Sequence, residues 1–219
     1  MAVRDGLGMR REVLWAEFLG LFVAVPVATA LLLPPRAMFA VLFGFTLVGL
    51  WLLARTPGFR WRELKRGWDE VRWPVVAGFA AATLAVSVVV VWLTAPEAAF
   101  RLVREQPMLL AMIVLFYPVL SALPQEVIFR PLFFRRYGAL LPTGALLAVN
   151  AAVFSLAHLM YWSAVVAAMT FAGGLVFGWA YRNRGSFPLA VVLHSVSGWV
   201  IFTVGLGVFF YSGNVTRPF

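Results

Sequence analysis

The stretch SALPQEVIFRPLFFRRYGALLP, Ser121–Pro142, places a carboxylate and a guanidinium inside a long apolar run. Glu126 and Arg130 are four residues apart, a spacing that puts both side chains on one helix face and allows an ion pair between them. The surrounding apolar residues extend over about Met108–Phe134, which exceeds the ~20 residues that a helix needs to cross a bilayer. The stretch therefore predicts a membrane-spanning helix with a polar feature in its interior.

The composition of the whole chain is that of a membrane protein. Of its 219 residues, 63% are hydrophobic and 12% are charged, against roughly 25% charged residues in a soluble domain, and the mean hydropathy is +0.90. Cysteine is absent, which excludes disulfides, thiolate metal sites and cysteine nucleophiles. We predict an all-α, polytopic transmembrane helical bundle of seven or eight spans that forms a single domain over residues 1–219.

Apolar runs of spanning length give the expected helices. They are Leu14–Leu33, Ala37–Leu53, Pro74–Thr94, Met108–Phe134, Leu140–His158, Trp162–Tyr181 and Phe187–Phe210. Between the second and third runs, residues 55–73 are basic and carry Trp61, Trp68 and Trp73. This pattern is typical of a segment that lies on the membrane surface with its tryptophans at headgroup level.

The net charge is +9, and the basic residues are unevenly distributed. Arg4, Arg10 and Arg11 precede the first span, and further groups follow the second, fourth and sixth spans, so that fourteen of the 18 Lys and Arg residues fall on one side. Cytoplasmic loops carry such an excess, which predicts a cytoplasmic N-terminus in a bacterial inner membrane. Basic loops between apolar runs face anionic lipid, so the bilayer is the expected partner and nucleic acid is not.

Ionisable side chains inside membrane spans are costly and usually mark function. The two histidines of the chain, His158 and His194, both fall in apolar spans, and together with Glu126 they come from three different helices. Each has a simpler explanation, since Glu126 and Arg130 could form a purely structural ion pair and a lone histidine often only bonds a neighbouring helix. Their coincidence favours a joint site.

Motifs of other intramembrane enzymes are missing. The chain has no HExxH string of a zinc protease, no aspartate inside a span and no GxSG serine turn. Gly174 and Gly178, in FAGGLVFG, are spaced as GxxxG, and here close helix packing without any chemistry is the preferred interpretation.

Three segments resemble the motifs of the CAAX prenyl protease and bacteriocin-processing (CPBP, or Abi) family. QEVIFR, FSLAH and HSVSG, which begin at Gln125, Phe154 and His194, stand in the order of the family's EExxxR, FxxxH and HxxxN, and the similarity covers about residues 110–210. The family consists of glutamic-type intramembrane endopeptidases. The resemblance thus implies hydrolysis of a peptide bond near the C-terminus or membrane anchor of a membrane-associated protein or peptide.

The resemblance also implies roles for the residues. A glutamate and a histidine activate water, while the second histidine and an asparagine stabilise the oxyanion, so we expect Glu126 as general base with His158 and His194 polarising water and the scissile carbonyl. Arg130 is expected to orient Glu126, and Gln125 to donate a hydrogen bond to the substrate. Glu126, His158 and His194 could instead hold zinc with an open coordination position, and the resemblance leaves both chemistries open.

The chain departs from the family's motifs at two positions. Gln125 replaces the first glutamate of EExxxR, and Gly198 replaces the asparagine of HxxxN; Ser197 is the polar side chain next to this gap. Because glutamine cannot take a proton from water, the alternative function is a catalytically inactive membrane scaffold or immunity-type binding protein with the same fold.

The depth of His158 sets a condition on this site. If its helix began at Leu140, His158 would lie roughly 27 Å along the helix, too far towards the opposite membrane face. Either this helix tilts strongly or it begins later, as Pro142 and Gly144 would permit.

Overall fold

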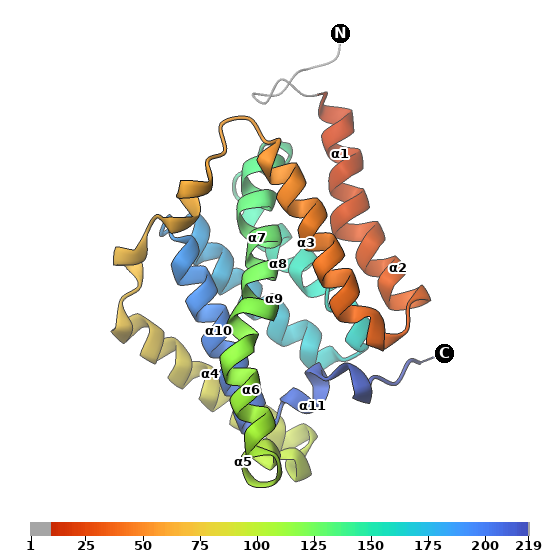
Figure 1. Ribbon diagram of the computed structural model, residues 1–219, viewed down its shortest axis with the longest axis vertical. Coiled ribbons are helices and arrows are strands. Elements are labelled where there is room, and N and C mark those ends of the chain that lie inside the picture. Colours follow the sequence, from red (N-terminus) through yellow and green to blue (C-terminus); the bar gives the residue numbers. More distant parts are fainter. Residues whose placement is uncertain (1–9, 219) are drawn as a thin grey trace.

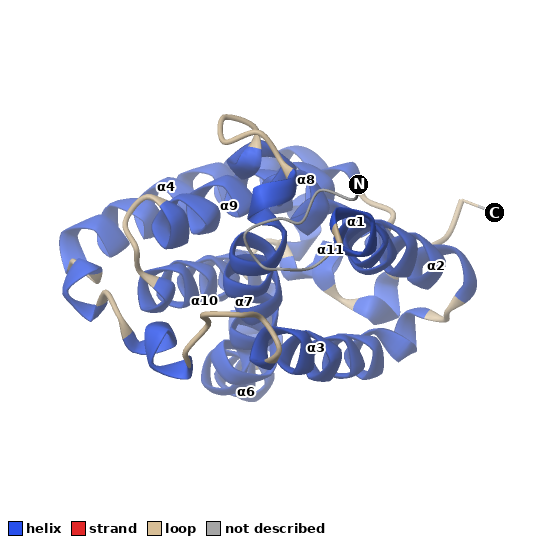
Figure 2. Cartoon of the chain, turned by 90° about the horizontal axis from the view of Figure 1, so that it is seen from above, coloured by secondary structure: helices blue, strands red, loops and turns tan. Residues whose placement is uncertain are grey.

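The helix that carries Glu126 runs through the middle of the molecule (Figure 1, green; Figure 2). The computed structural model describes residues 10–218, and within them every regular element is a helix. Arg4, one of the basic residues used to predict the orientation, lies outside the described residues. The prediction of an all-α, polytopic helical bundle is confirmed.

Six helical stretches are long and apolar enough to cross a membrane. They are Arg11–Leu32, Pro35–Ala54, Trp73–Thr94, Pro107–Leu140, Ala164–Arg182 and Phe187–Val204, and a shorter apolar helical stretch covers Leu146–Tyr161. The described residues thus hold six helical stretches of spanning length and one shorter apolar stretch. They contain no eighth apolar helix of ten or more residues.

The stretches divide into α-helices and short 3₁₀ or π segments (η). The α-helices are α1 Arg11–Leu19, α2 Val25–Leu32, α3 Met38–Ala54, α4 Trp73–Thr94, α5 Arg101–Glu105, α6 Pro107–Tyr117, α7 Leu123–Val127, α8 Leu146–Leu156, α9 Ala164–Arg182, α10 Phe187–Val204 and α11 Gly207–Phe210. The π segments are η1 Gly20–Ala24, η6 Pro118–Ala122 and η7 Ile128–Tyr137. The 3₁₀ turns are η2 Pro35–Ala37, η3 Trp61–Lys65, η4 Trp68–Glu70, η5 Pro96–Ala98, η8 Gly138–Leu140, η9 Leu159–Tyr161 and η10 Ser212–Asn214.

Two of the helices are shorter than their apolar runs. The fifth begins at Leu146 instead of Leu140, after an irregular stretch that includes Pro142. The seventh ends at Val204, because Gly205 adopts a left-handed conformation with φ 115°, which terminates helices and suits glycine. Hydropathy shows only how long an apolar run is, so it could not predict where the fifth helix begins or where the seventh ends.

The central helix is interrupted by prolines. α6, η6, α7 and η7 follow one another without a loop, and Pro118, Pro124 and Pro131 lie within them. A proline lacks the N–H that would bond the preceding turn and its ring crowds the carbonyl four residues earlier. Wider π turns, such as η6 and η7, accommodate this disruption and often occur at functional sites.

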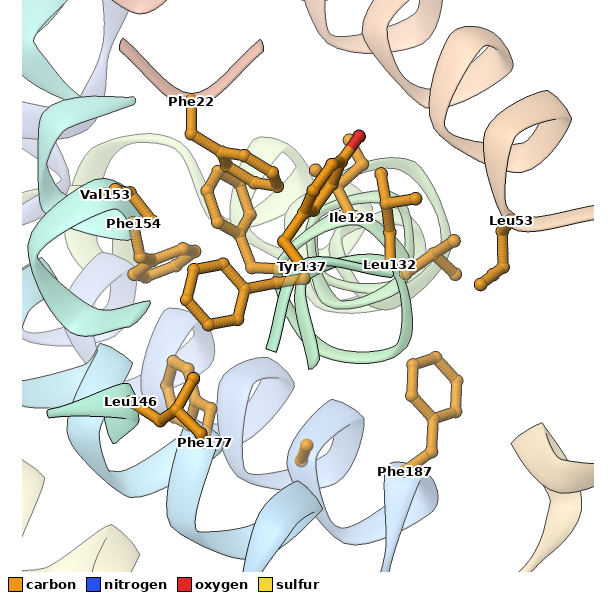
Figure 3. Packing of buried hydrophobic residues seen from close by; sticks show 14 of the residues in the cluster. Phe22, Leu53, Ile128, Leu132, Tyr137, Leu146, Val153, Phe154, Phe177 and Phe187 are labelled. Atoms are coloured by element: carbon orange, nitrogen blue, oxygen red, sulfur yellow. The ribbon is translucent and has the colours of Figure 1, made fainter. Parts of the chain in front are cut away.

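An aromatic core packs around the last turns of the central helix (Figure 3). The ring of Phe22 lies 5.6 Å from Phe129, 5.7 Å from Phe133 and 5.7 Å from Tyr137, in edge-to-face contacts. Such pairs contribute about 0.5–1.5 kcal/mol each beyond the burial of their area. The first span is thereby fixed against the helix that carries Glu126.

Ion pairs gather the basic loops at one end of the bundle. Arg136 binds both oxygens of Glu17 at 2.7 and 2.9 Å, and Arg135 binds Glu63 in the segment between α3 and α4. Arg184 pairs with Glu70 in the same segment. Three of the predicted basic groups therefore lie side by side. Their assignment to the cytoplasm stays a prediction.

The three tryptophans of the surface segment are exposed, as expected for headgroup-level side chains: Trp61 at 49%, Trp68 at 63% and Trp73 at 71%. Between them the chain forms only the short turns η3 and η4. Gly67 adopts φ 81°, and a Cβ there would lie 2.7 Å from the Cβ of Ser186. Ser186 Oγ donates to the Gly67 carbonyl at 2.6 Å, which fixes the segment to the start of α10.

The glycines of the GxxxG motif bring α8 and α9 together, as predicted. A Cβ at Gly174 would lie 2.8 Å from the Ala151 Cα, a backbone atom that cannot move aside cheaply. We expect Gly174→Ala to lower the free energy of unfolding by about 1–3 kcal/mol through overpacking. Unfolding in detergent micelles measures this. The matched control is Gly78→Ala in α4, where a Cβ meets nothing within 4 Å; equal effects of both variants would contradict the prediction.

Candidate active site

Glu126 and Arg130 form the predicted ion pair. Arg130 Nε donates to Glu126 Oε2 at 2.7 Å, and both side chains have no exposed surface. Taking two charges out of water is costly, and the pair is tolerated only if the remaining hydrogen-bonding atoms also find partners. The surroundings of Arg130 and Glu126 supply these partners.

Asn150, on α8, completes the bonding of Arg130. Its Oδ1 accepts from Arg130 Nη1, and its Nδ2 donates to the Phe129 carbonyl at 2.7 Å. A Cβ at Gly178 would lie 3.0 Å from this Oδ1, so the second glycine of the GxxxG motif also leaves room for the polar cluster. The sequence shows Asn150 as a polar residue in a span, but not that it binds Arg130.

His194, on α10, bonds the other oxygen of Glu126. Its Nδ1 lies 2.8 Å from Glu126 Oε1, and its ring stacks on Phe177 with centroids 4.8 Å apart and planes at 9°. The carboxylate already accepts from Arg130, and it accepts from the Nδ1–H of His194 as well. This hydrogen bond fixes the tautomer and leaves the lone pair on Nε2.

His158 follows the end of α8 and joins the same region. Its Nδ1 lies 2.7 Å from the Phe154 carbonyl, which can only accept, so this ring also carries its proton on Nδ1. Phe154 contacts both imidazoles, with ring centroids 4.8 Å from His158 and 5.6 Å from His194. Because the helical stretch Leu146–Tyr161 begins six residues later than expected, His158 lies roughly 18 Å from its start instead of roughly 27 Å, which meets the condition set on its depth.

A cavity of about 800 Å³ lies next to the two histidines. Its lining is mainly apolar and includes His158, His194, Gln125 and Ser197. Glu126 does not line it. The structure therefore brings the predicted residues together but places Glu126, the expected base, behind His194 and outside the cavity.

The supporting residues have their own partners. Gln125 Nε2 donates to Ser121 Oγ at 3.0 Å, while its Oε1 is buried without a partner in the described structure. Ser197 Oγ donates to the His194 carbonyl at 2.8 Å. Gln125 thus has an unused acceptor, and Ser197 is engaged by its own helix.

The donor atoms of the site are not arranged as a set of metal ligands. Within residues 10–218 no group of three or more His, Asp or Glu side chains is placed to hold a metal ion. Both oxygens of Glu126 accept from Arg130 and His194, and the Nδ1 atoms of both histidines are engaged. These residues do not form a three-ligand set that fits zinc.

Tyr117 and Ser121 were missed by the sequence analysis. Both line the cavity, and the Tyr117 ring lies 5.9 Å from that of His194. With Gln125 they repeat at intervals of four residues along the central helix, and this spacing could have indicated that the three side chains share one face. The sequence does not show which helix packs against that face, so the spacing alone does not distinguish a cavity lining from an ordinary polar helix face.

Comparison with known proteins supports the motif interpretation. Residues 107–200 match the family model described as type II CAAX prenyl endopeptidase Rce1-like. No curated protein and no solved structure matches the chain. The matched segment contains all three motifs. The match confirms the resemblance drawn from them: residues 107–200 are similar to the Rce1-like family, which is consistent with the CPBP family of intramembrane endopeptidases.

Proposed function

We propose that the protein is an intramembrane endopeptidase in which His194, oriented by Glu126, activates water in the cavity. The hydrogen bond between His194 Nδ1 and Glu126 Oε1 carries this proposal. It gives His194 a basic Nε2 and leaves a carboxylate behind the ring to stabilise the imidazolium, the arrangement that activates catalytic histidines elsewhere. Glu126 then acts through His194 and is a positioning residue.

The proposed reaction follows from this geometry. His194 Nε2 takes a proton from water as the water oxygen attacks the scissile carbonyl carbon, and Glu126 stabilises the resulting imidazolium. When the C–N bond breaks, the imidazolium returns the proton to the leaving amine. His158, whose Nε2 is also an acceptor, orients the attacking water. Arg130 and Asn150 hold Glu126 in place.

The substrate is a membrane-associated protein or peptide, cleaved near its C-terminus or membrane anchor. The largely apolar lining of the cavity supports this class, because such a lining favours apolar side chains or an anchor over a charged peptide. We place the protein in a bacterial inner membrane with its N-terminus in the cytoplasm, following the distribution of basic residues.

One set of observations favours a second candidate function, an inactive scaffold or immunity-type binding protein. Gln125 and Gly198 lack the groups that the family's motifs supply, and Glu126 is fully engaged by Arg130 and His194. Such a protein would keep the polar cluster only to fix its helices.

The decisive experiment is a cleavage assay with the full chain in proteoliposomes. The probes are internally quenched peptides with apolar C-terminal anchors, each made with and without a prenyl group, and the products are identified by mass spectrometry in H₂¹⁸O. We expect cleavage at one bond with ¹⁸O in the new carboxyl group, unchanged within twofold by excess 1,10-phenanthroline. No product from any probe would favour the scaffold. A loss with phenanthroline that zinc reverses would show that a metal is required.

A further inference from the structure

The cavity holds two hydrogen-bond acceptors and needs a donor. The Nδ1 protons of His158 and His194 are used by the Phe154 carbonyl and Glu126, so each neutral ring presents only a lone pair at Nε2. Hydrolysis of an amide develops negative charge on the carbonyl oxygen, which an active site stabilises with preorganised donors. In this chain, neither neutral histidine can do so.

Several hydroxyl groups that line the cavity are engaged elsewhere. Ser197 and Thr170 donate to backbone carbonyls of their own helices, at 2.8 and 2.7 Å. Tyr161 donates to the sulfur of Met38 at 2.8 Å. These three hydroxyls already have acceptors within the protein and would have to give them up to bind a substrate.

The ring of Tyr117 occupies the space that a side chain at position 198 would fill. A Cβ at Gly198 would collide with the Tyr117 ring, whose Cε1, Cζ and Cδ1 atoms are the nearest. Gly198 is one helical turn after His194, where HxxxN has its asparagine. The Tyr117 ring thus reaches from the central helix into the space that a side chain at 198 would need, and it lies edge-on to His194.

Tyr117, Ser121 and Gln125 are polar side chains spaced one turn apart along the central helix, and all three line the cavity. Gln125 Nε2 donates to Ser121 Oγ at 3.0 Å. Of the three, Tyr117 has its ring next to His194.

We propose that the Tyr117 hydroxyl donates the hydrogen bond that holds the scissile carbonyl oxygen, in place of a side chain at Gly198. The assignment rests on the proposed peptidase function. It also accounts for one departure from the family's motifs, since Gly198 makes room for the ring.

The test is Tyr117→Phe, which keeps the ring over Gly198 and removes only the hydroxyl. We expect kcat to fall about 10²–10³-fold, the usual cost of one oxyanion donor, while KM changes little because the bond strengthens in the transition state. The matched control is Tyr181→Phe on α9, which removes a hydroxyl outside the cavity and keeps the ring stacked on Phe134; its kcat should stay within twofold. An unchanged kcat in Tyr117→Phe would overturn the proposal.

A binding measurement separates this proposal from the peptidase function itself. The probe is a phosphinate analogue of an apolar peptide, which carries the tetrahedral oxyanion of the transition state but has no scissile amide, titrated by calorimetry in detergent. We expect Tyr117→Phe to weaken its binding about tenfold, in line with one hydrogen bond. If the wild type binds the probe through Tyr117 but cleaves nothing, the peptidase function fails and the donor role stands. Equal binding by both proteins, or by neither, overturns the donor role.

Discussion

His194→Asn is expected to lower the rate of peptide cleavage about 10²–10⁴-fold, the contribution of a positioned general base, in a protein that still folds. The Asn amide nitrogen occupies nearly the place of the imidazole Nδ1 and can donate to Glu126 Oε1. The buried carboxylate therefore keeps both of its hydrogen-bonding partners. The variant lacks a nitrogen that could take a proton from water.

Ser195→Ala is the matched control for this experiment. Ser195 neighbours His194 on α10, donates to the Val191 carbonyl at 2.7 Å and does not line the cavity. Cleavage rates and thermal midpoints in the same micelles should separate the two variants, with only His194→Asn losing activity. If His194→Asn cleaved at more than a tenth of the wild-type rate, the base would have to be another group.

Glu126→Gln is expected to destabilise the fold by about 3–5 kcal/mol, the usual cost of leaving one partner of a buried ion pair without the other. Arg130 is fully buried, and a neutral residue at position 126 removes the carboxylate that balances its charge. The measurement is denaturant or thermal unfolding in micelles.

The double variant Glu126→Gln/Arg130→Met should recover part of this loss, because no charge then remains buried in the pair. The amide oxygen of the new glutamine can still accept from His194, while Asn150 loses one bond. A single variant as stable as the wild type would contradict the pairing. Since the single variant is expected to be strongly destabilised, activity should be compared in the more stable double variant, where a loss of cleavage indicates that Glu126 tunes His194.

Much of this architecture follows from local features of the chain. Spanning helices need only apolar length, and the Glu126–Arg130 pair needs only four residues of helix, so both could be predicted from the sequence. The sequence allowed the late start of α8 at Leu146 but did not require it, because a proline such as Pro142 permits a break in a helix without demanding one. The short 3₁₀ turns between α3 and α4 depend on Arg135, Arg184 and Ser186, which are distant in the sequence.

The site required information that a sequence pattern does not contain. The spacing of Glu126 and His194 along the chain does not reveal which of them faces the cavity, and His194 is proposed as the base because it lines the cavity while Glu126 does not. The interaction of Tyr117 with Gly198 depends on how two helices cross. The π turn that begins at Pro118 alters the direction of side chains along the central helix, so ideal helical geometry would misplace them.

The position of His194 along α10 has a consequence for the choice of substrate. Its Cα lies roughly 12 Å along the helix from Ser186, the end held to the surface segment through Gly67. An extended peptide covers that distance in about four residues. For the proposed peptidase, a bond closer than this to a folded domain could not reach His194, and the depth of the site would select substrates by the length of their unstructured tail.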